Sequence, residues 1–492
     1  MPLSTYLLLA LTHPNEFRTL VQYKLWHSST RELETDPTSG WERESMRKCW
    51  AFLDMTSRSF AAVIKELEGG LARTICLYYL VLRGLDTIED DMTLDPDYKQ
   101  RLLRAFHKHT TTPGWTFTES GPNEKDRQLL VEYDVVVAEL LLLPPAELTP
   151  ILDIAAKMGN GMADFALRPA GHAVEGQAEY DLYCHYVAGL VGEGLSAIFA
   201  ASGKEGASLA RQLVLSNSMG IFLQKTNVTR DVCEDAEEGR FFYPATVYAP
   251  YGFPTPREMC PTSHEEKDVP QGALWVQSAM VANALTHAPD ALEYLRLLKN
   301  QSVFNFCAIP AAMAVATLEL CFMNPGMFVR NVKIRKAVAA DLIMRSKNPR
   351  EVSLIFREYA RKIHARMLPH DPNFMKLSVV CGKIEQWHEH AYPSFVQLPS
   401  SGSMTVRTQD PRGAVFVAEE KAASDERRRR QLDEVRRKMA EKGMPTPGTV
   451  GSPLQSDAYT REAMMWVVGI MLGFLVVGSG LAYWTLWYAG RL

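Results

Sequence analysis

The chain has 492 residues, of which 47% are hydrophobic and 22% are charged, and its formal net charge is −4. This length can build one large core or two ordinary domains. The near-neutral charge argues against a dedicated nucleic-acid binder, because phosphate backbones are bound by basic surfaces. The 8 cysteines form no Cys-x-x-Cys pair, so the sequence favours a reducing, cytosolic compartment over a disulfide framework.

The N-terminal region, 1–39, contains a short apolar run at 6–11 with no basic residue before it. A secretory signal peptide carries a basic segment before its apolar core. We therefore expect this run to belong to an N-terminal helical segment.

The region 40–398 shows apolar residues spaced three and four positions apart, as in 51–67, 71–85 and 181–199. This spacing is typical of amphipathic helices, and the alternation of half-buried strands is nearly absent. Breaks that contain proline separate the helical stretches at 95–96, 112–114, 143–145 and 250–256. The sequence therefore predicts one large all-α domain over 40–398.

The composition changes after residue 398. The region 399–461 is polar and contains a charged block at 421–442, followed by several prolines and glycines. This composition predicts a linker. Two interpretations of the charged block stay open: attraction to anionic lipid, or a solvated helix.

The C-terminal stretch 463–488 contains no charged residue over 26 positions. That length is enough to cross a hydrocarbon layer of ~30 Å, and the aromatic residues at its two ends are typical of membrane interfaces. Those aromatic residues are Trp466 at one end and Trp484, Trp487 and Tyr488 at the other. We predict a transmembrane anchor over 462–490, with a buried core helix as the alternative.

A first acidic cluster ends the apolar stretch 71–85. Asp86, Glu89 and Asp90 are spaced three and four positions apart, so their carboxylates share one helical face with no cation between them. Carboxylates that continue a buried face need a compensating cation, and Mg²⁺ prefers hard oxygen ligands. The alternative is a solvated helix end before Pro96.

A second polar stripe consists of Gln224, Asn227, Asp231 and Asp235, at offsets 0, 3, 7 and 11. Asp231 and Asp235 repeat the spacing of Asp86 and Asp90. On a continuous helix these four side chains form one face. Two such clusters predict a pocket with Mg²⁺ ions on opposite walls, where metal ions polarise a bound diphosphate.

Five strings in the same order carry a family resemblance. They resemble the squalene synthases (farnesyl-diphosphate farnesyltransferases) of the head-to-head isoprenoid synthase family, in a fungal form, and the resemblance covers about 40–390. The strings are Ser-Arg-Ser-Phe at 57–60, Tyr-Leu-Val-Leu-Arg at 79–83, Tyr-Cys-His-Tyr-Val-Ala-Gly-Leu-Val-Gly at 183–192, the stripe 224–235, and Phe-Asn-Phe-Cys-Ala-Ile-Pro at 304–310.

The resemblance implies an isoprenoid-synthase-type helical bundle around a central cavity, with the C-terminal anchor outside it. It implies head-to-head condensation of two farnesyl diphosphates to presqualene diphosphate, which is then rearranged and reduced to squalene with Mg²⁺ and NADPH. The metal ligands that it implies are Asp86, Glu89, Asp90, Asn227, Asp231 and Asp235. The substrate-binding residues that it implies are Arg58, Phe60, Tyr79, Arg83, Gln224, Asn227 and Arg230.

The resemblance also gives Tyr183 the proton transfer of the first half-reaction, beside the catalytic carboxylates of Asp86, Asp90, Asp231 and Asp235. Phe306, with Phe60 and Tyr79, matches positions suited to face a carbocation. For each of these aromatic residues alone, ordinary core packing is the alternative.

The string 192–197 has the Gly-x-Gly-x-x-Ala form of a dinucleotide fingerprint, but it lies in a helical pattern and follows no strand. We therefore reject a Rossmann loop there. The resemblance implies that NADPH is bound instead by the basic segment with Lys333 and Arg335, for which a solvated turn is the alternative.

The anchor and the resemblance together predict a monomer on the endoplasmic reticulum membrane, with its catalytic domain facing the cytosol and membrane lipid around the C-terminal helix. No nucleic-acid partner is expected. Two alternatives remain: a condensation of the phytoene synthase kind without reduction, and a tail-anchored scaffold protein.

Overall fold

The computed structural model describes residues 12–26, 32–57, 60–166, 174–394, 421–422, 424–430 and 433. Within these residues the regular structure is helical throughout and no strand occurs, so the all-α prediction is confirmed. The chain divides into two compact units, Met1–Met404 and Thr405–Leu492.

The first unit contains the long helices. Its α-helices are α2 (Pro14–Trp26), α3 (Glu44–Thr56), α4 (Phe60–Lys65), α5 (Leu71–Asp90), α6 (Pro96–His109), α7 (Arg127–Val131), α8 (Asp134–Leu140), α9 (Pro145–Ala166), α10 (Gln177–Cys184), α11 (Leu190–Ala201), α12 (Leu213–Arg230), α13 (Val232–Glu237), α14 (Ala245–Tyr248), α15 (Gln271–Leu285), α16 (Ala288–Leu297), α17 (Gln301–Cys321), α18 (Lys336–Arg345), α19 (Pro349–Arg366) and α20 (Phe374–Ala391). The shorter turns are the π-helix η1 (His185–Gly189) and the 3₁₀ turns η2 (Leu209–Arg211), η3 (Ala249–Tyr251), η4 (Pro256–Met259), η5 (Glu266–Asp268) and η6 (Pro325–Phe328).

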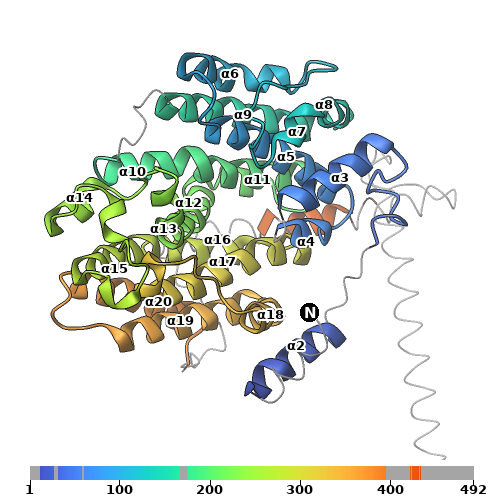
Figure 1. The fold of residues 1–492 in the computed structure, drawn as a ribbon. Coiled ribbons are helices and arrows are strands. Elements are labelled where there is room, and N and C mark those ends of the chain that lie inside the picture. Colours follow the sequence, from blue (N-terminus) through green and yellow to red (C-terminus); the bar gives the residue numbers. More distant parts are fainter. Residues whose placement is uncertain are drawn as a thin grey trace, which may run out of the picture. The chain divides into compact units, whose positions relative to one another are not determined.

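Helix α12 lies at the centre of the first unit, between two groups of helices (Figure 1). It packs against α10, η1 and α11 on one side and against α15, α16 and α17 on the other. From α11 the packing continues to α9 and α6, and from α17 it continues to α19 and α20. Residues Met219–Phe222 of α12 are buried, which is why this helix can be surrounded by others.

Helix starts follow the expected chemistry. The Asp95 carboxylate accepts a hydrogen bond from the Tyr98 amide at 2.9 Å, and Pro96 occupies the first turn of α6. An aspartate cap followed by proline is a favoured helix start. The predicted break at 95–96 is therefore confirmed.

Two stretches predicted as single helices are interrupted. The stretch 181–199 is divided by η1 between α10 and α11, and the stretch 51–67 breaks at Ser57, whose backbone is extended (φ −139°, ψ 90°). Apolar spacing did not reveal either break. The helices on both sides of η1 and of Ser57 continue the same apolar spacing, so the pattern shows no interruption there.

Several helical glycines allow close contact between helices. A Cβ at Gly192 would overlap the backbone of Ser216 on α12, and one at Gly159 would overlap the backbone of Leu103 on α6. At these two positions the close neighbour is the backbone of another helix. Each such glycine costs about 1 kcal/mol of helix propensity relative to alanine, which the close packing offsets.

Two described helical stretches, Gln177–Ala201 and Gln301–Cys321, are long and apolar enough to cross a membrane. In the second, 72% of the apolar window is buried in the unit, so core packing explains its composition. The predicted anchor over 462–490 lies outside the described residues. In the charged block, Arg430 pairs with Glu426 one turn earlier in an exposed helix, at 2.6 Å.

Candidate active site

The first acidic cluster lies at the C-terminal end of α5, as predicted. Burial raises the pKa of Asp86 to about 6, although Arg83, whose Nη1 lies 3.6 Å from the Asp86 carboxylate, acts in the opposite direction. Burial, together with Asp90 and Asp86, raises the pKa of Glu89 well above its ordinary value. Burial therefore disfavours the charged forms of Asp86 and Glu89, and the neighbouring cations only partly offset this effect.

The second cluster is not on one continuous helix, so that part of the prediction is wrong. Helix α12 ends at Arg230 and α13 begins at Val232, with Asp231 between them (φ −94°, ψ 14°). The amide of Asp231 still donates to the Asn227 carbonyl, and the amide of Asp235 donates to the Asp231 carbonyl, both at 2.9 Å. Because these helix-type bonds persist, the two carboxylates remain one turn apart.

Arg240 connects the two clusters. Its Nη1 donates to Asp90 at 3.0 Å and its Nη2 donates to Asp235 at 3.0 Å. One guanidinium group therefore spans the distance from the end of α5 to α13. The two acidic clusters consequently face a common space.

Sequence spacing did not identify Arg240. It follows Gly239, whose φ of +75° turns the chain back, and its amide donates to the Asp235 carbonyl at 2.8 Å. A left-handed residue of this kind favours glycine. In the sequence, a glycine followed by an arginine just after the acidic stretch 234–238 was the signal that could have identified Arg240 as a partner of the second cluster.

Burial raises the pKa of Asp235 to about 7, while Arg240 acts to lower it. A carboxylate that is so buried, beside a second cluster of carboxylates, fits the oxygen-rich sites that hold Mg²⁺ with a substrate phosphate. No three metal-ligating side chains converge on one point among the described residues. The donor set fits the ion in chemistry, with the remaining ligands left to water and substrate.

Tyr183, near the C-terminal end of α10, lies within electrostatic reach of the first cluster. It is 7% exposed and stacks on Phe242, with ring centroids 5.0 Å apart and planes 17° apart. Burial, followed by the charges of Glu89 and Asp90, raises the pKa of Tyr183 well above its ordinary value. The hydroxyl is therefore protonated and lies within the field of the α5 carboxylates.

The predicted diphosphate-binding arginines lie beside both clusters. Arg230 holds Asp231 through two hydrogen bonds, Nε to Oδ1 at 2.7 Å and Nη2 to Oδ2 at 2.5 Å. Arg83 donates through Nη2 to the Tyr79 hydroxyl at 3.0 Å. Its Nε also lies 3.8 Å from Asp126, a carboxylate that the sequence did not single out. Arg58 lies outside the described residues.

The predicted aromatic residues differ in their surroundings. Phe60, at the start of α4, is 39% exposed, whereas Phe306 on α17 is 6% exposed and packs edge-on against Phe199 with centroids 6.0 Å apart. On α12, Gln224 is half-buried and Asn227 is exposed. No described contact tests the substrate roles of these four residues, which stay predictions.

The basic segment before α18 reaches the second cluster. The Asn331 side chain donates to the Glu234 carboxylate of α13 at 2.6 Å. Two residues further on, Lys333 is exposed, and Arg335 donates to Glu16 of α2 at 2.7 Å. Lys333 and Arg335 therefore lie on a loop that is fastened next to α13.

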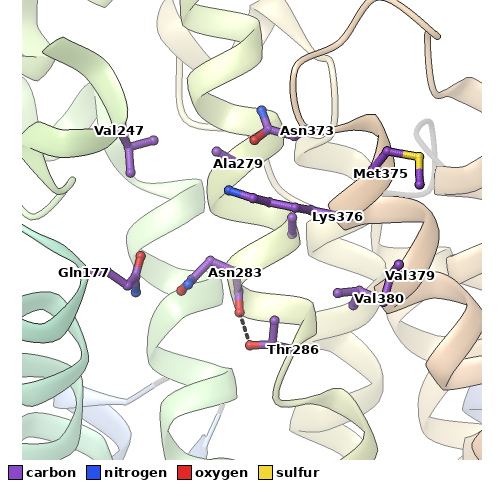
Figure 2. Close-up of a pocket in the computed structure, with 11 residues that line it drawn as sticks. Gln177, Val247, Ala279, Asn283, Thr286, Asn373, Met375, Lys376, Val379 and Val380 are labelled. Atoms are coloured by element: carbon purple, nitrogen blue, oxygen red, sulfur yellow. Dashed lines mark hydrogen bonds between the residues drawn. The ribbon is translucent and has the colours of Figure 1, made fainter. Parts of the chain in front are cut away.

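Two cavities lie near α10. One of about 430 Å³ lies among α10, α14, α15 and α20, and Figure 2 shows Gln177 of α10 opposite Asn283 of α15, with Lys376 of α20 extending across the opening. A second, of about 360 Å³, lies between the end of α9 and α10 and is lined by Phe165, whose ring packs against Tyr183. None of the predicted site residues lines either cavity.

Comparisons with known proteins agree with this arrangement. The family model described as squalene/phytoene synthase matches residues 53–338. A squalene synthase of Ganoderma lucidum is 55% identical over 89% of this chain and 97% of its own length. One of Schizosaccharomyces pombe is 50% identical over 77% of this chain and 81% of its own.

The fold has solved relatives as well. A structure of TcSQS with the ligand BPH1237 superposes with a TM-score of 0.65 at 38% identity, covering 70% of this chain and 99% of that one. The family model spans the residues that carry both acidic clusters. The chain therefore belongs to the squalene/phytoene synthase family, as a relative of the fungal squalene synthases.

Proposed function

We propose that this chain condenses two molecules of farnesyl diphosphate head to head to presqualene diphosphate and converts that intermediate to squalene. The fungal relatives that match most of its length are squalene synthases. The structural observation that carries the proposal is the bridge from Asp90 through Arg240 to Asp235. It brings two carboxylate clusters to one space, as the binding of two diphosphates through metal ions requires.

Magnesium is the metal that this site suits. Asp86, Glu89 and Asp90 would hold it on one side, and Asp231 and Asp235, assisted by Asn227, on the other. When bound, the metal neutralises the charge of the leaving diphosphate. Arg83 and Arg230 are already at the cluster edges, where each can exchange a carboxylate for a phosphate oxygen.

Tyr183 is assigned the proton transfer of the first half-reaction. Its hydroxyl is protonated at neutral pH, so it acts as a relay: as it takes the proton released from the reacting carbocation, it passes its own proton to a carboxylate of α5. Phe165 and Phe242 pack on its ring and help to exclude water from the hydroxyl. We assign carbocation-facing positions to Phe60, Tyr79 and Phe306, and a substrate contact to Gln224.

NADPH is the proposed reductant, with Lys333 and Arg335 binding its 2′-phosphate. The hydrogen bond from Asn331 to Glu234 supports this assignment, because it fastens the basic loop beside α13. A cofactor bound there lies next to the second acidic cluster, where an intermediate must remain for reduction.

We further propose that the stretch 462–490 anchors the chain as a monomer in the endoplasmic reticulum membrane, with the catalytic unit facing the cytosol. The stretch is uncharged and flanked by aromatic residues. An anchor of this kind places the site at the membrane that accepts so apolar a product.

The experiment that tests the reaction is incubation of the purified full-length chain with farnesyl diphosphate and Mg²⁺, with and without NADPH. Presqualene diphosphate in both cases, and squalene only with NADPH, is the expected result. A product that NADPH does not alter indicates a condensation of the phytoene synthase kind. No prenyl product in either case contradicts the proposed function.

A further inference from the structure

A buried ammonium group, which the proposed chemistry does not use, lies on α12 two residues before Asn227. Lys225 on α12 is 2% exposed. Its Nζ donates to the Asp181 carboxylate of α10 at 2.5 Å and to Nε2 of His287, between α15 and α16, at 3.0 Å. The Nζ also lies over the Tyr180 ring, 5.4 Å from its centroid. Burying an ammonium is costly unless it is paired and hydrogen-bonded, so each of these contacts matters.

The direction of every hydrogen bond in this network follows from Lys225. An ammonium can only donate, so His287 accepts through Nε2 and carries its proton on Nδ1. That proton points to the Ser218 hydroxyl, 3.2 Å away, and Ser218 donates to Asp290 at 3.0 Å. Burial and the adjacent Lys225 lower the pKa of His287 to about 4, which agrees with a neutral ring. The network therefore has one consistent arrangement.

The network connects α10, which carries Tyr183, to α12, which carries Asn227. Asp181 precedes Tyr183 by two residues on α10, so their side chains point to nearly opposite sides of that helix. Lys225 likewise precedes Asn227 by two residues on α12. The ion pair between Asp181 and Lys225 joins α10 to α12, while Tyr183 and Asn227 project from other faces of these helices.

Helix α10 has few other attachments to α12. Just beyond it, η1 is fixed tightly: the His185 ring is hydrogen-bonded to Asn217 at 2.6 Å, and a Cβ at Gly189 would overlap the same Asn217 carboxamide. On the N-terminal side of Tyr183, Lys225 of α12 contacts both Asp181 and the Tyr180 ring of α10. Within α10, Gln177 donates to the same Asp181 carboxylate at 2.8 Å. The ion pair therefore links α10 to α12 on the N-terminal side of Tyr183, in addition to the buried ring of Tyr180 and the fixed η1.

We propose that Lys225 is a positioning residue of the first half-reaction: by holding Asp181 it fixes the direction in which Tyr183 meets the α5 carboxylates. This inference rests on the proposed function of Tyr183. Lys225 touches neither substrate nor metal. Its effect is expected in the rate of the chemical step and not in the affinity for farnesyl diphosphate.

The test compares Lys225→Met, Asp181→Asn and the double variant in the full-length chain with Mg²⁺. We expect Lys225→Met to lower kcat for presqualene diphosphate about 10- to 100-fold, because misplacing a catalytic group by about 1 Å can cost 100-fold. KM for farnesyl diphosphate should change by less than about twofold, since the binding groups are untouched. Asp181→Asn should have the same effect with a smaller loss of kcat.

The double variant separates positioning from stability. Each single variant leaves one charge without its partner and should lower Tm, whereas the double variant leaves none and should recover Tm. If Lys225 positions Tyr183, kcat of the double variant stays low although Tm recovers. If kcat recovers together with Tm, or if Lys225→Met keeps the wild-type kcat, the proposal is wrong.

Ser278→Ala is the matched control. It removes another buried hydrogen bond to a carboxylate, that of Asp371, and should lower Tm with kcat unchanged.

The orientation of Tyr183 can be observed directly. With 3-fluorotyrosine at position 183, ¹⁹F NMR should show one sharp resonance in the wild type and a shifted or broadened one in the Lys225→Met variant. Unchanged spectra contradict the proposal. If Lys225→Met does not fold, kcat and Tm of Asp181→Asn and of the double variant test the proposal in its place. A wild-type chain that forms no prenyl product overturns the proposed function itself.

Discussion

Asp90 of α5 and Asp235 of α13 share one cation, although 145 positions separate them in the sequence. Arg240 donates to each carboxylate at 3.0 Å and also pairs with Glu238 at 2.7 Å. Its Nε is buried without a hydrogen-bond partner in the described part of the chain. The guanidinium thus compensates one carboxylate of each cluster, at the place where Mg²⁺ and diphosphate are proposed to bind.

Arg240 and Mg²⁺ are therefore expected to compete. Arg240→Met should lower the unfolding free energy of the metal-free protein by about 1 kcal/mol, because two carboxylates lose their cation. The same change should tighten Mg²⁺ binding in the absence of diphosphate. Thermal unfolding in EDTA and calorimetric titration with Mg²⁺ measure the two effects. Weaker Mg²⁺ binding in this variant would show that Arg240 does not compete.

Both clusters should be needed for turnover. Asp86→Asn and Asp231→Asn, made separately, should each lower kcat/KM by more than about 100-fold, beyond the range typical of residues that only support a metal ligand. Circular dichroism should show the helical fold retained. Asp153→Asn is the matched control, since this exposed aspartate of α9 lies outside both clusters and pairs with Lys157 at 2.7 Å. Full activity in both cluster variants would contradict the two-sided site.

The pH dependence of stability follows from Asp86 and Asp235. Their pKa values, about 6 and about 7, lie above the ordinary value of 3.8, so the folded metal-free protein holds more protons than the unfolded chain between about pH 4 and 7. Stability should therefore fall as pH rises through this window.

The variant Asp235→Asn isolates that effect. It should lose part of the pH dependence and be more stable than the wild type at pH 8. Mg²⁺ binding to the wild type should strengthen from pH 5 to 8, because the ligands must lose their protons. Urea unfolding in EDTA at several pH values measures the stabilities. Parallel curves for the two proteins would refute the assignment.

Tyr183→Phe tests the proton-transfer role. The change keeps the ring that stacks on Phe242 and removes only the hydroxyl, so Tm should hardly change. The rate of presqualene diphosphate formation should fall by about 10²- to 10⁴-fold, the range for a lost general acid or base. A single-turnover assay with labelled farnesyl diphosphate measures this rate. A rate close to that of the wild type would assign the proton transfer to another group.

The two half-reactions should respond differently at Arg335. Arg335→Ala should raise KM for NADPH about 10-fold, equivalent to ~1.4 kcal/mol, while presqualene diphosphate formation without NADPH stays unchanged. Glu16→Gln, which removes the partner carboxylate of Arg335 on α2, should leave KM for NADPH equal or lower. Assays with NADPH and NADH compare the 2′-phosphate contact directly. An equal effect on both cofactors would exclude that contact.

The helices and both acidic clusters were predictable because apolar spacing and carboxylate spacing are local properties of the chain. Asp86, Glu89 and Asp90 lie at the end of α5 as the spacing of 71–90 predicted. The interruptions at η1 and Asp231 were not predictable, since the flanking helices keep the same apolar periodicity across them.

By itself, the sequence determined the helical class, the two acidic clusters and the uncharged C-terminal stretch, all of which depend on residues close together along the chain. Only the tertiary structure decided what lies across the site. Arg240 bridges clusters from two helices, and Lys225 pairs with Asp181 from 44 positions away. Such contacts depend on how α5, α10, α12 and α13 pack, and packing brings together residues whose spacing in the sequence carries no signal.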